Sequence, residues 1–541
     1  MNTDFPQIVQ FQYGEQWYTA APAGERFETD KARLTLRQDD AGLHVQLASR
    51  EPISYVKLRW RHALPAGARV LGDAVERAYG DLAWECVNPY KQLMWYCFIT
   101  AGGRTEGFGV SVRPAAICFW QVDPDGVTLW LDVRCGGDPV RLGGRVLDVC
   151  TVLFADSREG ETPFRFTARF CRLLSPAPRL PSYALYGVNT WLYTYGYLYS
   201  DMSRESILRD CRFYADLAGP CENRPAMVVD DGWNAHIPQH GGACGGPHTG
   251  GNDRFPEMET FAQAIREQGC RPGLWARLLP HYDETLPREL FLQRSPDTAQ
   301  VLDPSHPEAL RIIEQETQRL CGWGFELLKH DFSWYDLMGE GTLQTNWRLT
   351  PRGWHFYDTS RTSAEILIGL YAAIRQAAGD TALIACNCPG HLCAGLTEYY
   401  RIGGDTSGYV WDRTRKFGVN SLAFRLCQHR AFYELDADCV GHRDEYIPWE
   451  YTQRFMDLLA YSNTPLLLSI DPAELRDPKR QAAVADAFAR SRARSSTLEP
   501  LDWMDNPFPE HWEMDGKPVR LPLSLPEGTL NFGSLTQFEW V

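Results

Sequence analysis

The chain has 541 residues, 44% of them hydrophobic, and a formal net charge of −15 at pH 7. This length is too great for one compact core, so two or three domains are expected. The acidic balance, without any block of lysines and arginines, argues against a nucleic-acid partner, because binding to phosphates requires a basic surface.

The first residues, MNTDFPQIVQFQYGEQW, lack the basic start and apolar core of a signal peptide. No stretch approaches the roughly 18 apolar residues of a membrane span, so no membrane partner is expected. Sixteen cysteines without an export signal are typical of reduced thiols. We therefore expect a cytoplasmic protein.

Short alternating segments from about residue 5 to 170 predict β-strands. Examples are LTLRQDDAGLHVQLAS and VTLWLDVRCGGDPVRL, which Gly, Pro and Asp interrupt. Such strands, separated by turn signals, are typical of an antiparallel sandwich. We assign residues 1–175 to an N-terminal β-sandwich domain, and the proline-rich joint LLSPAPRLPSY marks its end.

The next segment predicts an α/β fold. Helical patterns such as SRESILRDCRFYADLAG, with cap residues at both ends, separate eight short apolar runs. Eight strands alternating with helices over roughly 290 residues predict a (β/α)8 TIM barrel, which we assign to residues 181–496. Residues 497–541 are expected to form a short C-terminal β segment. The apolar runs begin at residues 184, 225, 271, 325, 381, 399, 436 and 464.

Polar side chains end several of the predicted strands. The second run ends in Asp230 and Asp231, the fourth, FELLKHDF, in Lys329 and Asp331, and the sixth is followed by Asp405. In a barrel of this kind, catalytic groups gather at the C-terminal ends of the strands. Several carboxylates are therefore expected at one rim.

Two carboxylates across one rim are what glycoside hydrolysis requires, one to attack the anomeric carbon and one to protonate the leaving oxygen. One must stay ionised while the other holds a proton. Lys329 lies two residues before Asp331, on the same face of the strand, and would help to keep Asp331 ionised. Asp405 lies between small residues in GGDTS, which leave room for a ligand and suit an acid/base.

The motifs VVDDGW, RPGLW, LLKHDFS and RIGGDTS, in this order, resemble the α-galactosidase group of glycoside hydrolase family 36 and, more distantly, family 27 of clan D. The resemblance spans about residues 184 to 470, and its most diagnostic parts are K-x-D on the fourth strand and R-x-x-x-D on the sixth. It implies a retaining exo-α-galactosidase that works by double displacement, with Asp331 as the nucleophile and Asp405 as the acid/base.

The resemblance also implies a set of residues around the sugar. Asp230 and Asp231 would lie near the 4- and 6-hydroxyls, Lys329 near the 3- and 4-hydroxyls, and Trp233 against the ring. Arg401 would help Asp405 to hold the side of the 2-hydroxyl. The other candidate substrate-binding residues are Trp275, Asn387 and Cys388 and, more loosely, Trp191 and Asn189.

The sequence departs from the family pattern at two places. His330 stands where an aromatic residue is usual, and CNCPGHLC replaces a Cys-Ser-Gly-Gly-Gly run that touches the sugar near C2 in the family. Four alternatives therefore stay open. In the first, the substrate is another glycoside, such as an α-N-acetylgalactosaminide or a β-L-arabinopyranoside. In the others, the chain is a transglycosylase like raffinose synthase, a sugar-binding barrel without catalysis, or a metal-dependent hydrolase. Both aspartates are present, which argues against lost catalysis.

No metal and no organic cofactor is expected, because two carboxylates suffice for the reaction. Zinc binding by CNCPGHLC would need four clustered ligands. The expected partner is an oligosaccharide or another glycoside, and nothing in the sequence supports an oligomer. For a retaining enzyme the two carboxyl groups should lie about 5–5.5 Å apart.

The sequence does not assign a role to several other residues and segments. We expect His330 to face the layer between barrel and helices, because side chains alternate along a strand. His442 and Asp438, on the seventh run, have no assigned role. The segments 236–256 and 334–360 would border the site or only cover the barrel.

Overall fold

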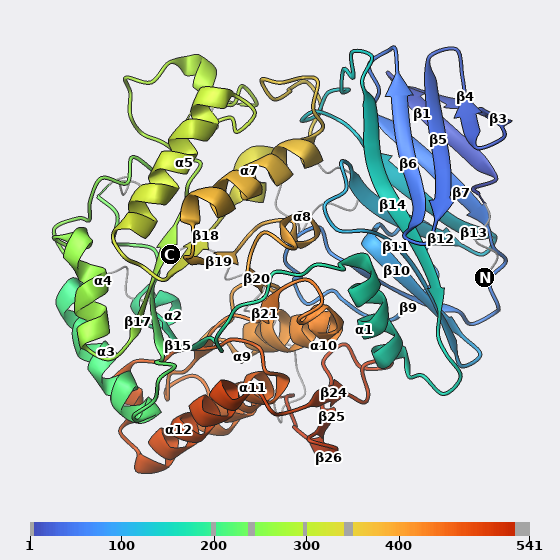
Figure 1. Cartoon of the computed structure of the whole chain (residues 1–541). Coiled ribbons are helices and arrows are strands. Elements are labelled where there is room, and N and C mark those ends of the chain that lie inside the picture. The colour runs from blue at the N-terminus through green and yellow to red at the C-terminus, as the bar shows by residue number, and fades with distance from the viewer. Residues whose placement is uncertain (1–4, 196–201, 236–243, 296–299, 340–349, 525–541) are drawn as a thin grey trace.

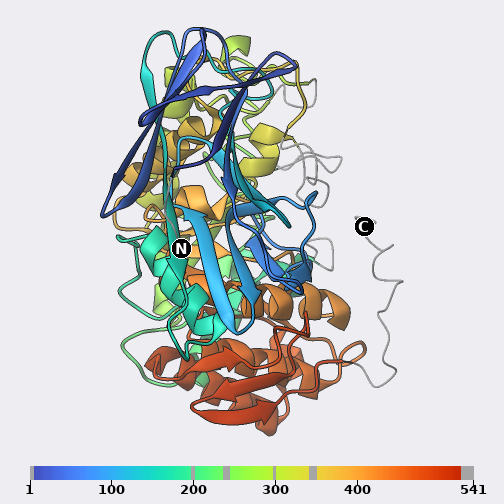
Figure 2. The ribbon, with the colours of Figure 1, turned by 90° about the vertical axis from the view of Figure 1, so that its right-hand side faces the viewer.

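The computed structural model describes residues 5–195, 202–235, 244–295, 300–339 and 350–524. The N-terminal strands form one side of the molecule, and the helix-covered barrel forms the other (Figure 1). The C-terminal strands lie at the lower edge, below both (Figure 2).

The N-terminal strands make one hydrogen-bonded antiparallel sheet, in which β8 and β9 branch off β10 and the main order is β2-β1-β7-β13-β12-β10-β11-β14-β6-β5-β4-β3. The strands are β1 (Ile8–Tyr13), β2 (Gln16–Thr19), β3 (Ala21–Ala23), β4 (Arg26–Glu28), β5 (Ala32–Asp39), β6 (Gly42–Ser49), β7 (Tyr55–Arg61), β8 (Arg69–Asp73), β9 (Glu85–Cys86), β10 (Leu93–Ala101), β11 (Arg104–Val110), β12 (Ile117–Asp123), β13 (Gly126–Asp132) and β14 (Val146–Asp156).

This sheet folds back on itself into a sandwich. Trp60 on β7 and Phe154 on β14 are far apart in the strand order, yet their ring centroids are 5.4 Å apart. Phe108 on β11 packs against Phe154 at 5.8 Å, and Trp120 on β12 packs against Trp60 at 6.0 Å. Rings from distant strands thus share one core, which confirms the predicted sandwich.

A helix that the sequence pattern did not predict follows the last of these strands. Helix α1 (Pro163–Leu174) begins where the Thr162 hydroxyl accepts a hydrogen bond from the Arg165 amide. A threonine cap followed by proline is a helix-start signal, and here it marks the first turn of α1.

Helix α1 packs closely on β11. Ring centroids of Phe170 and Phe98 are 5.6 Å apart, and a Cβ atom at Gly107 or Gly109 would come within 2.9 Å of the Phe170 ring. The two glycines therefore allow the helix to approach the sheet.

The barrel has the expected eight parallel strands, in the sheet order β21-β20-β19-β18-β17-β16-β15-β23-β22. The seventh strand is split into β21 and β22, which form the two ends of this order, and between them Asp438 has a φ of 70°. Because one short chain segment supplies both ends, the sheet closes on itself. The strands are β15 (Tyr186–Asn189), β16 (Ala226–Val229), β17 (Arg271–Ala276), β18 (Leu327–His330), β19 (Ala382–Ala385), β20 (Tyr399–Arg401), β21 (Glu434–Asp436), β22 (Val440–Gly441) and β23 (Leu466–Ser469).

Helices connect the strands and cover the barrel, as the cap signals predicted. Ser203 and Thr362 begin α3 and α7 with capping boxes, and Gly219 and Gly379 end them. The longer helices are α3 (Arg204–Ala218), α4 (Met258–Glu267), α5 (Pro307–Gly322), α7 (Ser363–Ala378), α11 (Trp449–Ser462) and α12 (Pro478–Ala493), and the shorter ones are α2 (Trp191–Tyr195), α6 (Ser333–Met338), α8 (Gly390–Cys393), α9 (Trp411–Arg413), α10 (Ser421–Arg425), η1 (Arg288–Leu290), η4 (Thr414–Asn420), η5 (Leu426–Gln428) and η6 (Pro472–Leu475).

The inside of the barrel is a small apolar cluster of its own, which includes Val228, Leu327 and Tyr399. Two residues further along each strand, on the same face, stand Asp230, Lys329 and Arg401. Charged side chains therefore begin where the apolar filling ends, at the C-terminal rim.

The C-terminal strands β24 (Leu498–Pro500), β25 (His511–Met514) and β26 (Lys517–Arg520) form a three-stranded antiparallel sheet. Trp503 beside it contacts the rings of Trp84, Phe164 and Phe424, at centroid distances of 5.5 to 5.6 Å. This contact joins the N-terminal strands, α1 and the barrel. The proposed domain boundaries at 175, 181 and 496–497 remain predictions.

All sixteen cysteines are free thiols. Within the described part of the chain, every helix is too short or too polar to span a bilayer.

Replacing Gly109 by alanine should destabilise the protein by about 1–3 kcal/mol, the usual cost of overpacking. The new methyl group would lie 2.9 Å from atoms of both Phe170 and Leu174. Denaturant unfolding measures the effect. The matched control is Gly322→Ala in α5, where no atom lies within 4 Å of the added carbon and a gain of about 0.4–1 kcal/mol is expected. Equal effects in both variants would contradict the packing of α1 on β11.

Candidate functional site

Asp331 follows β18 and is held by three donors. Its Oδ2 accepts a hydrogen bond from the indole N–H of Trp275 at 2.9 Å. Its Oδ1 accepts from the side-chain amide of Asn387 at 2.6 Å and from the backbone N–H of Phe332 at 2.7 Å. Phe332 and Asn387 have φ values of 65° and 48°, a backbone region that costs energy outside glycine and is common at functional sites.

Asp331 is an ionised carboxylate at neutral pH. Burial would raise its pKa, because the side chain is only 7% exposed. The charges of Lys329 and Arg77 and the bonds from Trp275 and Asn387 outweigh burial and bring the pKa below its usual value. The environment thus keeps the charge that a nucleophile needs.

A buried ion pair lies next to Asp331. Lys329 donates to Asp230 Oδ2 at 2.7 Å, and the Asn189 amide donates to the same oxygen at 2.9 Å. The two charged side chains are 4% and 2% exposed. Burial opposes the charge of Lys329, but Asp230 raises the pKa of the ammonium well above its usual value. Lys329 is therefore a fixed cation between Asp230 and Asp331.

Asp405, four residues after Arg401, is fixed by two arginines. Its Oδ1 accepts from Arg401 and from Arg77, both at 3.0 Å, and 28% of its side chain is exposed. Arg401 also pairs with Asp438 at 2.5 Å, and Asp438 accepts from the backbone and hydroxyl of Thr406.

The surroundings of Asp405 correct one expectation. We expected this carboxyl to hold a proton, but the charges of Arg77 and Arg401 outweigh the effect of burial and hold its pKa well below the usual range. In the free protein, both Asp331 and Asp405 are therefore ionised at neutral pH.

Two members of this network were not assigned from the sequence. Asp438 had no assigned role, although its place in the seventh apolar run could have indicated that it lies near the other rim residues. Arg77 lies more than 300 positions before its partner, in the N-terminal domain, and no spacing could have indicated it.

Two predicted substrate-binding residues are fully buried. Trp233 has no exposed surface; its indole donates to the Trp275 carbonyl at 2.9 Å, and its ring packs on Trp323. Cys388 is fully buried, with its sulfur 3.1 Å from the Ser333 hydroxyl and 3.8 Å from His330 Nδ1. The side-chain amide of Asn387 faces Asp331, whereas the thiol of the next residue, Cys388, faces the helices.

The remaining candidates border the site. His330 packs near Tyr371 of α7, at 6.1 Å between ring centroids, which confirms that it faces the helix layer. Asp231 is partly buried, and its Oδ1 accepts from the Gly232 amide. Trp191, partly buried at the start of α2, donates its backbone N–H to the Asn189 side chain.

Neither potential metal site fits a metal ion. In CNCPGHLC, His391 turns away and bonds to the Val110 carbonyl at 2.8 Å. In the described residues, one group of three potential ligands converges: His442, Asp444 and Glu474. There the guanidinium of Arg480 bonds to Asp444 at 2.6 and 2.9 Å and already supplies the positive charge.

The segments 236–243 and 340–349 lie outside the described residues. The predicted roles of the loop 236–256 and of the segment 334–360 therefore remain open.

No protein-family model and no curated protein matches the sequence. Solved structures do match. An α-galactosidase from Thermus thermophilus, in complex with p-nitrophenyl α-D-galactopyranoside, superposes with a TM-score of 0.61 at 17% identity, over 92% of this chain and all of the other. The chain has the fold of the family 36 α-galactosidases.

Two further structures agree with this fold. A family 36 α-galactosidase from Geobacillus stearothermophilus has a TM-score of 0.54 at 13% identity, over 86% of this chain and 68% of the other. A cycloalternan-degrading enzyme from Trueperella pyogenes has the same score at 11% identity, over 96% and 87%. The resemblance inferred from the four motifs is thus confirmed for the architecture.

Replacing Lys329 by methionine should cost about 3–5 kcal/mol of stability, because Asp230 would keep a buried charge without its partner. Denaturant unfolding at pH 7 measures this cost. The double variant Lys329→Met/Asp230→Asn should lose less than the sum of the two single variants, because it removes both charges. Strict additivity would contradict the ion pair.

Proposed function

We propose that the chain is a retaining exo-α-glycosidase that hydrolyses terminal α-linked galactosides. One observation carries this proposal: Asp331 and Asp405 follow strands β18 and β20 at the same rim, and each is fixed by donors to specific oxygens. The motifs and the fold of the family 36 α-galactosidases support it.

Because Asp405 is ionised in the free protein, it takes up a proton before the first step. In that step Asp331 attacks the anomeric carbon while Asp405 gives this proton to the departing oxygen. In the second step, Asp405 takes a proton from water, which displaces Asp331 from the sugar. In the second step the negative charge returns to Asp331, and Lys329, held in place by its bond to Asp230, stabilises the departing carboxylate.

The identity of the sugar is the more specific part of the proposal. Asp230, fixed by Asn189 and Lys329, and Asp231 beside it offer oxygens to sugar hydroxyls, as the resemblance implies. Asn387, which the family pattern would place near C2, bonds to Asp331 instead. A substituent at C2 is therefore the variation to test first.

The glycoside is the proposed partner, and the sixteen free thiols support a cytoplasmic location.

The deciding assay is release of nitrophenol from p-nitrophenyl α-galactoside by the wild type, by Asp331→Ala and by Asp405→Ala. The wild type should turn over, and both variants should lose most of the rate. Glu284→Gln, an exposed carboxylate beyond β17, is the control that should keep it. If the wild type releases no nitrophenol from this substrate but hydrolyses an N-acetylgalactosaminide, the proposed sugar is wrong and the proposed mechanism is retained.

Added azide separates the two roles. With Asp331→Ala, azide takes the place of the nucleophile and should give the β-galactosyl azide. With Asp405→Ala, azide attacks the glycosyl-enzyme and should give the α-galactosyl azide. The same product from both variants would contradict the assignment. Proton NMR of the products identifies the anomer.

Trp275→Phe should lower kcat/KM by about 10- to 100-fold, since a hydrogen bond to a charged group contributes about 1.5–3 kcal/mol. An aromatic ring remains, but it is smaller and lacks the N–H that donates to Asp331. Trp120→Phe removes a comparable indole bond, to the Trp95 carbonyl in the N-terminal domain, and should leave kcat/KM unchanged. Equal losses in both would show a general effect on folding.

A further inference from the structure

A segment of the N-terminal domain reaches the barrel site. Residues 74–84, between β8 and β9, lie against the loop that carries Asp405. The Ala78 amide donates to the Ile402 carbonyl at 2.8 Å, and the Gly404 amide donates to the Ala78 carbonyl at 3.0 Å. Through these bonds the segment pairs with the stretch of backbone that leads from β20 to Asp405.

A buried arginine fixes both partners of this contact. Arg425 donates to Asp73 Oδ1 at 2.7 Å and to the Ile402 carbonyl at 2.8 Å. It also bonds to the carbonyl of Glu76. The position of Arg77 relative to Asp405 is therefore set by backbone contacts on both sides, and does not depend on a mobile side chain alone.

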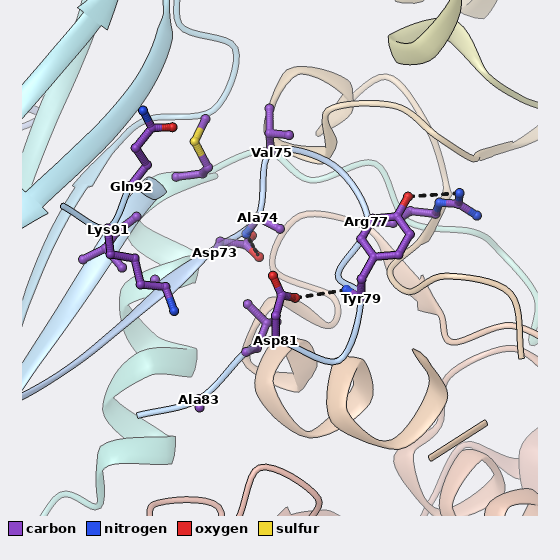
Figure 3. A pocket seen from close by; sticks show the side chains of 13 residues that line it. Asp73, Ala74, Val75, Arg77, Tyr79, Asp81, Ala83, Lys91 and Gln92 are labelled. Atoms are coloured by element: carbon purple, nitrogen blue, oxygen red, sulfur yellow. Dashed lines mark hydrogen bonds between the residues drawn. The ribbon is translucent and has the colours of Figure 1, made fainter. Parts of the chain in front are cut away.

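The guanidinium of Arg77 has its own support. Its Nη2 donates to the Tyr79 hydroxyl at 3.1 Å, that hydroxyl donates to Glu76 Oε1 at 2.7 Å, and Arg77 Nε lies 3.4 Å from Glu76 Oε2. Figure 3 shows Arg77 and Tyr79 together on the side of the segment that faces the barrel. Together with Asp73, Asp81 and Lys91, among others, they line a cavity.

Arg77 and Arg401 differ in how far their charge is already neutralised. Arg401 pairs with Asp438 at 2.5 Å, whereas Arg77 meets Glu76 at 3.4 Å. The other cations that act on Asp405 are Arg413 of α9 and Lys329 of β18. Arg77 is thus the cation in direct contact with Asp405 that the barrel does not supply.

Both arginines use the same oxygen of Asp405. Oδ1 accepts both bonds, so a proton on Oδ2 would leave them intact, because a neutral carboxyl group still accepts at its carbonyl oxygen. We propose that Arg77 is a positioning residue contributed by the N-terminal domain: it holds Oδ1 of Asp405, directs the catalytic proton to Oδ2, and sets the pH range in which that proton is present.

This inference rests on the proposed function. In the first step, the proton on Oδ2 passes to the glycosidic oxygen as its bond to the anomeric carbon breaks and the bond to Asp331 forms. In the second step, water attacks the anomeric carbon, its proton passes to Oδ2, and Asp331 leaves as a carboxylate. Arg77 keeps its own proton throughout.

The sign of the effect follows from charge. An opposite charge at this distance lowers a carboxyl pKa by about 1–3 units. Loss of Arg77 should therefore raise the pKa of Asp405, and the protonated form should persist to higher pH. Only substrates whose leaving group needs a proton should respond.

The test compares pH profiles of kcat/KM for methyl α-galactoside, whose leaving group needs a proton, and 2,4-dinitrophenyl α-galactoside, whose leaving group does not. With Arg77→Gln, the alkaline limb for the methyl glycoside should move up by about one pH unit or more, and the dinitrophenyl profile should not move. Arg77→Lys should return the limb toward that of the wild type. Arg59→Gln, which breaks a pair with Asp123 in the same domain, is the control and should match the wild type.

An unmoved limb in Arg77→Gln, or equal shifts for both substrates, would overturn the proposal. A second measurement does not need turnover: infrared titration of the carboxyl band that Asp405→Asn removes, in wild type and in Arg77→Gln. A rise of that titration point by about one unit supports the coupling, and an unchanged point refutes it. If the wild type cleaves no glycoside, the proposed function fails, while the titration still decides whether Arg77 controls Asp405.

Discussion

Burial of charge inside the barrel is the constraint on which the site depends. The apolar filling of the barrel ends at the level of Val228 and Leu327, and the next inward residues are Asp230 and Lys329. A charge at this depth is tolerated only when it is paired and hydrogen-bonded. The 2.7 Å pair therefore fixes both residues, and the position of Asp331 at the rim follows.

The two carboxylates are held in different ways. Asp331 is bound mainly by neutral donors, Trp275 and Asn387, which orient it without cancelling its charge. Asp405 is bound by guanidinium groups and is partly exposed. Both sets of partners lower the pKa of the carboxyl group, through nearby cations and neutral donors at Asp331 and through direct ion pairs at Asp405. The difference lies in the partners, since the two residues are chemically the same.

The N-terminal domain does more than cover the barrel. Its segment 74–84 pairs with the backbone before Asp405, and Trp84 packs on Trp503 beside the C-terminal sheet. The three parts of the chain thus meet around Trp84 and Trp503. A site assembled in this way depends on the relative position of the domains as well as on the barrel.

By itself the sequence determined the sandwich, the eight barrel strands and the rim that carries Asp331 and Asp405, because periodicity, caps and strand ends are local properties. It also placed His330 correctly, since alternation holds within a strand. The sequence patterns failed at two places. Helix α1 starts inside a region that was predicted to form strands. Cys388 lies beyond the end of β19, after Asn387, whose left-handed backbone conformation interrupts the alternation of the strand. Only the tertiary structure decided that Trp233 is core and that Arg77 holds Asp405, because these contacts join residues far apart in the chain.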